Sequence, residues 1–171
     1  MKHNLTRRTF LRQAVVGSAF ASCGIAKPWI VPASVLGADA PSNQVAMGAI
    51  GVGGRGSGLV NEAAAQPNTK IVAVCDVFRD RRERMAQAMN QRYGGQVCTP
   101  YNDLREMIDR PDIDAVIIAT PDHWHVPAAL MAVRAGKDVY VEKPLGLSME
   151  ELWAIRAAVQ RYGRIFQYGT Q

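Results

Sequence analysis

Val45-Ala46-Met47-Gly48-Ala49-Ile50-Gly51-Val52-Gly53-Gly54-Arg55-Gly56 is the segment from which the architecture of this chain can be inferred. A short apolar run, typical of a buried strand, leads into a glycine cluster with the spacing G-x-G-x-x-G, and a helical pattern over 58–65 follows. Glycine at these positions permits a tight turn at Gly51, a close approach of a bound group at Gly53 and close helix–strand packing at Gly56. The spacing alone is a weak signal, because glycine-rich turns are common.

Beyond this segment, apolar runs alternate with helical patterns. Continuous β-branched runs at 71–75 and 115–119 are typical of strands buried on both faces of a parallel sheet. Further strands are expected near Val97, at 139–141 and from Ile165 onward, and further helices over 80–93, after Asn102 or Asp103, over 126–135 and over 149–162. Alternating strands and helices predict βαβ units, and right-handed crossovers then favour an α/β fold with a doubly wound parallel sheet.

Two of these helices have recognisable start signals. Asp80 with Glu83, and Ser148 with Glu151, have the spacing of a capping box. Gly94 stands where the first of the two helical patterns stops, as a left-handed C-terminal residue does. The sequence therefore predicts helix starts at Asp80 and just after Ser148.

An acidic residue gives the glycine cluster the context of a dinucleotide-binding fingerprint. Asp76 ends the second predicted strand, where a carboxylate accepts hydrogen bonds from the adenosine ribose. The helix N-terminus that follows the glycines adds free N–H groups and partial positive charge for phosphates. The sequence therefore predicts a Rossmann-type NAD(P)-binding domain. The alternative is a glycine-rich turn with Asp76 as a helix cap.

The same carboxylate bears on the choice of cofactor. Because Asp76 would repel a 2′-phosphate, NAD is favoured over NADP. Arg79, Arg81 and Arg82 follow closely and could soften this preference, although a solvated helix face is the simpler interpretation of them.

Two later strands end in residues suited to chemistry. The strand over 115–119 leads into Thr120-Pro121-Asp122-His123-Trp124-His125, and doubly wound sheets bind ligands at this edge. His123 and His125 suggest a metal site, but no third ligand has suitable spacing, so no metal is expected. The strand over 139–141 leads into Glu142-Lys143-Pro144. Lys143 would assist proton transfer beside a nicotinamide, or would instead pair with Glu142 on the rim.

Three segments together resemble the Gfo/Idh/MocA oxidoreductase family: the glycine cluster, the segment 120–125, and Ala135-Gly136-Lys137-Asp138-Val139-Tyr140-Val141-Glu142-Lys143-Pro144. The resemblance covers residues 45–171 and implies NAD(P)-dependent oxidation or reduction of a sugar, cyclitol or related polyol. It implies Lys143 as the catalytic residue near the reacting carbon. It also implies a set of cofactor-binding residues: Gly51, Val52, Gly53, Gly54, Arg55, Gly56, Asp76, Thr120, Pro121, His125, Glu142 and Lys143.

Members of that family carry a second, C-terminal α/β domain that completes the substrate pocket and forms the subunit interface. This chain reaches Gln171, so the substrate domain is expected to be absent from it. Homo-oligomers are expected only where that domain is present. Two other functional classes stay open beside a polyol oxidoreductase: an NAD-dependent glycosidase on the same fold, and a non-catalytic nucleotide-binding module.

Charge is distributed unevenly along the chain. Residues 1–38 hold five basic side chains and no acidic one, whereas the remaining residues hold 15 of each. The net charge of +5 therefore belongs to the N-terminal segment, and no nucleic-acid partner is expected. With 48% hydrophobic and 20% charged residues, the composition is that of an ordinary globular chain.

The N-terminal segment resembles a twin-arginine export signal. Arg7-Arg8 precede Phe10-Leu11 and a mildly apolar run over 14–26. We expect a signal over 1–38, a linker over 39–44, the dinucleotide-binding domain over 45–171, and a periplasmic protein carried by the twin-arginine machinery. The alternatives are a retained amphipathic helix and a lipoprotein-like site at Cys23. Cys75 and Cys98 are expected to be small buried residues.

Overall fold

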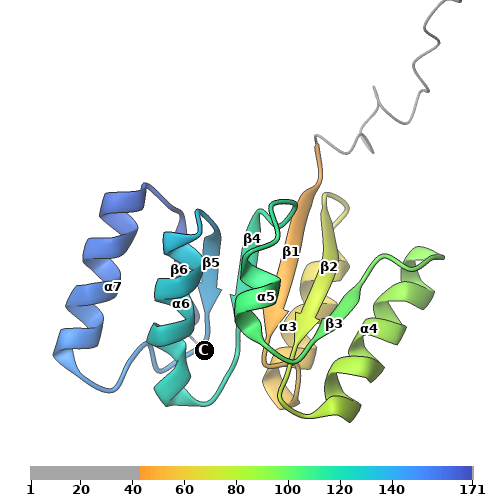
Figure 1. Ribbon diagram of the computed structural model, residues 1–171, viewed down its shortest axis with the longest axis horizontal. Helices are drawn as coiled ribbons and strands as arrows, with labels where there is room; N and C mark the ends of the chain where they lie inside the picture. Colours follow the sequence, from red (N-terminus) through yellow and green to blue (C-terminus); the bar gives the residue numbers. More distant parts are fainter. Residues whose placement is uncertain (1–42, 171) are drawn as a thin grey trace, which may run out of the picture. The chain divides into compact units, whose positions relative to one another are not determined.

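A computed structural model describes residues 43–170, which form an α/β unit around one sheet (Figure 1). The expected export signal over 1–38 lies outside the described residues, as does most of the linker. None of the helices between residues 43 and 170 is long and apolar enough to cross a membrane.

Six strands form the sheet, and every neighbouring pair runs parallel. Their order is β3-β2-β1-β4-β5-β6. The strands are β1 Val45–Ile50, β2 Thr69–Cys75, β3 Thr99–Tyr101, β4 Ala115–Ile118, β5 Asp138–Val141 and β6 Phe166–Tyr168. The prediction of a doubly wound, Rossmann-type α/β fold is confirmed.

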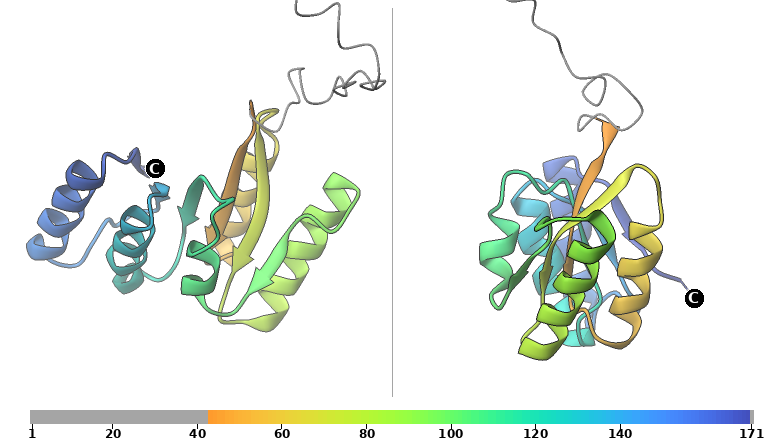
Figure 2. Two further views of the ribbon diagram at one scale, coloured as in Figure 1. Left: turned by 45° about the horizontal axis from the view of Figure 1, so that its top comes forward. Right: turned by 90° about the vertical axis from the view of Figure 1, so that its right-hand side faces the viewer.

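Helices cover both faces of the sheet, as the two views of Figure 2 show. They are α3 Gly54–Ala64, α4 Arg79–Tyr93, α5 Leu104–Ile108, α6 His125–Arg134 and α7 Met149–Tyr162, with a short 3₁₀ helix η3 at Asp122–Trp124. One core cluster packs α3 and α4 against the sheet, and the other packs α5, α6 and α7. Strands β2 and β4 contribute apolar residues to both clusters, which explains their uninterrupted apolar runs.

Some helix ends differ from the sequence prediction. Helix α3 begins at Gly54, four residues before the expected start. The capping box predicted at Asp80 is wrong: α4 begins at Arg79 behind Phe78, with no side-chain cap. Asp80 and Glu83 instead form ion pairs one turn along the helix, with Arg84 and Arg79.

Other ends are confirmed. The Glu151 N–H donates to Ser148 Oγ at the start of α7, and the Arg105 N–H donates to Asp103 Oδ1 at the start of α5. Gly94 closes α4 in the left-handed conformation, with φ of 71°. The strand expected near Val97 begins at Thr99 instead. The Val97 N–H donates to Asn90 Oδ1 at 2.7 Å, so it does not pair with a neighbouring strand.

The strand order positions the functional site. Connections from β1 run through β2 to β3 on one side, whereas β4, β5 and β6 extend the sheet on the other. The order therefore reverses between β1 and β4, and a crevice opens at the carboxyl ends of strands at such a point. The glycine cluster follows β1 here, and Thr120 follows β4.

Candidate dinucleotide site

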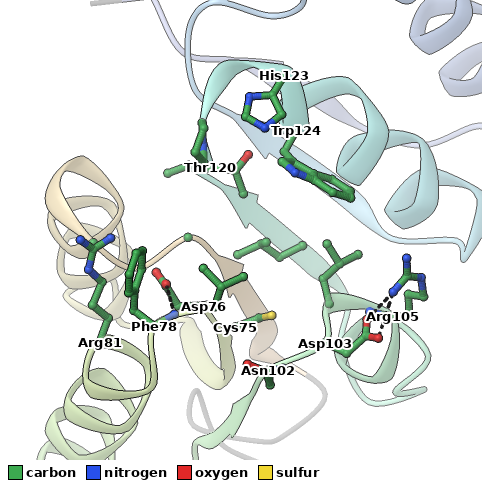
Figure 3. A pocket seen from close by; sticks show the side chains of 17 residues that line it. Cys75, Asp76, Phe78, Arg81, Asn102, Asp103, Arg105, Thr120, His123 and Trp124 are labelled. Atoms are coloured by element: carbon green, nitrogen blue, oxygen red, sulfur yellow. Dashed lines mark hydrogen bonds and ion pairs between the residues drawn. The ribbon is translucent and has the colours of Figure 1, made fainter.

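A cleft of about 640 Å³ lies at the carboxyl edge of the sheet (Figure 3). Its walls come from the segments that follow β1, β2, β3 and β4. The lining residues are Ile50, Gly51, Gly53, Cys75, Asp76, Val77, Phe78, Arg81, Asn102, Asp103, Leu104, Arg105, Ala119, Thr120, Pro121, His123 and Trp124. The site therefore lies where the topology of the sheet predicts a ligand.

The glycine cluster brings three backbone segments together without side chains. Gly51 has a φ of 79°, and a Cβ on it would stand 2.6 Å from the Ala119 carbonyl oxygen. A Cβ on Gly56 would overlap the Gly51 carbonyl oxygen. Gly53 precedes the first turn of α3 and offers no side-chain cap, so the helix N–H groups stay open to an anion.

Asp76 fixes the loops on either side of the cleft. Asp76 is only 7% exposed. One carboxylate oxygen accepts the Val52 N–H at 3.0 Å, and the other accepts the Phe78 N–H at 2.9 Å. Each oxygen keeps a lone pair that a ribose hydroxyl can use. Asp76 thus lies in the cleft wall with its carboxylate already oriented.

The three arginines after Asp76 do not share one environment. Arg79 is on the outer face of α4, paired with Glu83. Arg82 donates to the Asp76 carbonyl oxygen at 3.2 Å. The guanidinium of Arg81 lies 4.2 Å from the centre of the Phe78 ring and lines the cleft (Figure 3). Arg79 and Arg81 are exposed, as a solvated helix face predicts, but Arg81 also lines the cleft, and Arg82 is half-buried.

Thr120 lines the cleft, and its hydroxyl is unsatisfied. Its Oγ1 is buried and has no hydrogen-bond partner within the part of the chain that the structure describes. Such a group costs free energy unless a ligand or water meets it. Together with the side-chain-free cradle at Gly51 and Gly56, this hydroxyl fits a dinucleotide with phosphate and ribose groups.

Arg55, within the glycine cluster, forms an ion pair with Glu142, which lies 87 residues later in the sequence. Glu142 is 4% exposed, and its Oε1 accepts the Arg55 Nε–H at 3.0 Å. That hydrogen bond raises the pKa of Arg55 above its ordinary value. Neither residue lines the cleft. Both were expected to bind the cofactor, and their contact instead joins the start of α3 to the end of β5.

Lys143 follows Glu142 and lies exposed outside the cleft wall. Its backbone N–H donates to Glu142 Oε2 at 3.1 Å. The alternative ion pair on the rim is not what the structure shows: the carboxylate of Glu142 takes the Arg55 guanidinium and the Lys143 backbone. The ammonium of Lys143 makes no hydrogen bond or ion pair with residues 43–170.

His125 lies behind the cleft rather than in its wall. It is 1% exposed, and its two ring nitrogens face the Thr120 and Pro144 carbonyl oxygens. His123, in contrast, is exposed and lines the cleft. The two histidines therefore do not converge, and no three His, Cys, Asp or Glu side chains gather for a metal between residues 43 and 170.

Cys75 and Cys98 are buried, as the sequence predicts. Burial raises the pKa of each thiol to about 12. Both are therefore protonated and unreactive at neutral pH. Cys75 contributes to the cleft floor as a small apolar residue.

Sequence reasoning missed several residues of the cleft wall. Val77 and Phe78 are exposed apolar side chains that line the cleft, and Asn102 and Leu104 follow β3. One signal could have found them, since each stands just beyond the carboxyl end of a predicted strand.

The sequence identifies the family to which this site belongs. Residues 45–170 match the Gfo/Idh/MocA family, described as an oxidoreductase family with an NAD-binding Rossmann fold. The chain belongs to this family, and its described domain is an NAD(P)-binding Rossmann domain.

The curated relatives and solved structures that this chain resembles include two kinds of enzyme. The chain is 36% identical to glycosyl hydrolase family 109 protein 1 of Shewanella sp. strain MR-4, and 35% identical to an alpha-N-acetylgalactosaminidase of Shewanella oneidensis. In each case the alignment covers 93% of this chain but 38% of the relative. Scyllo-inositol dehydrogenase from Lactobacillus casei, solved with NAD(H) and scyllo-inositol, has a TM-score of 0.66 and 26% identity, over 74% of this chain and 36% of that one.

Replacing Gly56 by alanine should abolish the close approach on which the cleft depends. The new Cβ would overlap the Gly51 carbonyl oxygen, so the loop must shift or α3 must move. We expect Gly56→Ala to lower the unfolding free energy and to remove binding of NADH, measured by urea denaturation and by fluorescence titration.

Gly58→Ala is the matched control, because it lies in the same helix and its Cβ would approach only the end of Arg55, at 4.0 Å. This variant should bind NADH normally and gain about 0.5–1 kcal/mol of stability. Equal behaviour of the two variants would contradict the role assigned to Gly56.

Proposed function

We propose that this chain supplies the NAD site of an enzyme that cleaves glycosides through reversible oxidation of a sugar carbon. The proposal is supported by the combination of a binding site and a sequence similarity. The chain has a dinucleotide cleft, and it shares 36% identity over 93% of its length with a protein named as a glycosyl hydrolase.

Different residues of the cleft would bind different parts of the cofactor. The backbone at Gly51–Gly56 and the N-terminus of α3 would hold the phosphates. Asp76 would bind the adenosine ribose, and Thr120 would give its unpaired hydroxyl to the cofactor. When bound, NAD accepts hydride from a carbinol carbon and returns it. Lys143 would hold or move the proton of the substrate hydroxyl at the end of β5.

A second candidate is a polyol dehydrogenase with net hydride transfer. The similarity to scyllo-inositol dehydrogenase favours it, since that neighbour binds NAD(H) and scyllo-inositol. Its sequence identity of 26% is lower than that of the glycosyl hydrolases, so we rank it second. Both candidates require the same cofactor site and a sugar-like substrate.

We further propose that NAD is preferred over NADP. The carboxylate of Asp76 lies in the cleft wall and would repel a 2′-phosphate. Arg81 lies on the same side of the cleft (Figure 3) and would reduce the preference without reversing it, because Asp76 is held by two backbone N–H groups and cannot turn away.

Asp76→Ala tests this cofactor preference. Loss of the charged acceptor should weaken NAD binding by about 1–3 kcal/mol and NADP binding less or not at all. Asp80→Ala, which removes an exposed carboxylate of α4 paired with Arg84, should change neither affinity. Titration calorimetry with both cofactors measures the difference. Equal losses of affinity for the two cofactors in Asp76→Ala would show that Asp76 does not bind the adenosine ribose.

The reaction is tested with the complete product of the gene, a chromogenic α-N-acetylgalactosaminide and scyllo-inositol. A glycosidase should release the chromophore in an NAD-dependent manner without accumulation of NADH. A polyol dehydrogenase should accumulate NADH with the inositol and release no chromophore, which would overturn the first candidate. Saturable NAD binding without either reaction would favour a non-catalytic module.

We also propose export through the twin-arginine route, on the basis of Arg7-Arg8 and the acid-free segment 1–38. This route carries folded proteins, so the enzyme would load its cofactor in the cytoplasm and retain it. Replacing Arg7-Arg8 by Lys-Lys should trap the precursor in the cytoplasm, as cell fractionation would measure. Normal periplasmic accumulation of that variant would contradict the proposal.

A further inference from the structure

His125 occupies an unusual position for a polar side chain. It is the first residue of α6, directly after η3, and only 1% of it is exposed. Nε2 lies 2.8 Å from the Thr120 carbonyl oxygen, and Nδ1 lies 2.5 Å from the Pro144 carbonyl oxygen. One ring therefore spans from the loop after β4 to the loop after β5.

Both groups that the ring faces are hydrogen-bond acceptors. A neutral imidazole donates at one nitrogen and presents a lone pair at the other, whereas the doubly protonated ring donates at both. In either case the ring supplies at least one donor to a carbonyl. A phenylalanine of similar size would supply none and would leave both carbonyl oxygens facing an apolar ring.

The two carbonyls belong to functional segments. Thr120 lines the cleft and carries a buried, unpaired hydroxyl. Pro144 follows Lys143, the proposed catalytic lysine. The pairing of β4 with β5 ends at Ile118 and Val141, with one further bond from the Glu142 N–H to the Ile118 carbonyl oxygen. Beyond that point, the His125 ring contacts a carbonyl oxygen of each loop.

We propose that His125 is a positioning residue that sets the separation between the Thr120 segment and Lys143. The inference rests on the proposed function, because it takes Thr120 to contact the cofactor and Lys143 to lie beside it. His125 itself touches neither the cleft nor the substrate. Its role is to keep the lysine at the cofactor while the cofactor is held at Thr120.

The test measures acylation of Lys143 by an amine-specific reagent, with and without saturating NADH, by peptide mass spectrometry on the full chain. Lys70, near the start of β2 and so at the opposite edge of the sheet, is the internal reference. In the unaltered chain, NADH should slow labelling of Lys143 several-fold and leave Lys70 unchanged.

Three variants separate positioning from stability. His125→Phe should bind NADH yet lose the protection of Lys143, and His125→Gln, which keeps an N–H donor, should restore part of it. Val133→Ala removes buried volume from the same helix without removing a donor, so it should lower stability and keep full protection. If His125→Phe does not fold, the partial loss in His125→Gln carries the test.

The outcomes distinguish this proposal from the function on which it rests. Failure of the unaltered chain to bind NADH would overturn the proposed function. Binding without protection of Lys143 would overturn the placement of the lysine and this proposal with it. Full protection in a folded, NADH-saturated His125→Phe or His125→Gln variant would overturn the positioning role alone.

Discussion

The carboxyl edge of the sheet depends on how closely the chain returns on itself between Gly51 and Gly56. Without side chains at these two positions, the end of β1, the start of α3 and the backbone at Ala119 come into direct contact. Asp76 then ties this turn to β2 through the Val52 N–H. The helix N-terminus and the carboxylate are thereby held close together at one cleft, where the phosphates and the adjoining ribose of a dinucleotide would bind.

Longer-range contacts complete the same edge. Arg55, at the start of α3, reaches the buried Glu142 after β5, and His125 bridges the loops after β4 and β5. Neither contact lies in the cleft wall. Their effect is to fix the backbone from which Thr120 and Lys143 project, so the arrangement of those two residues follows from polar groups placed behind them.

Much of the fold follows from local sequence. Uninterrupted apolar runs at β2 and β4, the cap at Ser148 and the left-handed Gly94 are local signals with a direct physical cause, and the structure confirms them. The start of β3 was missed because the Asn90 side chain takes the Val97 N–H, a contact that no local pattern reveals.

The site residues that were predictable from the sequence are those whose roles depend on the backbone. The glycine spacing and Asp76 are motif positions whose roles depend on backbone geometry, and the structure brings them together at the cleft. The side chains of Arg81, Arg55 and His125 were not predictable in the same way. Arg81 folds over Phe78, Arg55 turns to Glu142, and His125 is buried between carbonyl oxygens. Such choices depend on tertiary partners rather than on spacing.

The central claim is that this cleft binds NAD(H) through the glycine cluster, Asp76 and Thr120. An NMR titration of the ¹⁵N-labelled chain with NADH tests it most directly. The account predicts saturable shifts of one-to-one stoichiometry concentrated at residues 50–57, 75–78 and 119–124, with the amides of α7 unmoved. Saturable shifts centred elsewhere, or no shifts at millimolar NADH, would contradict it.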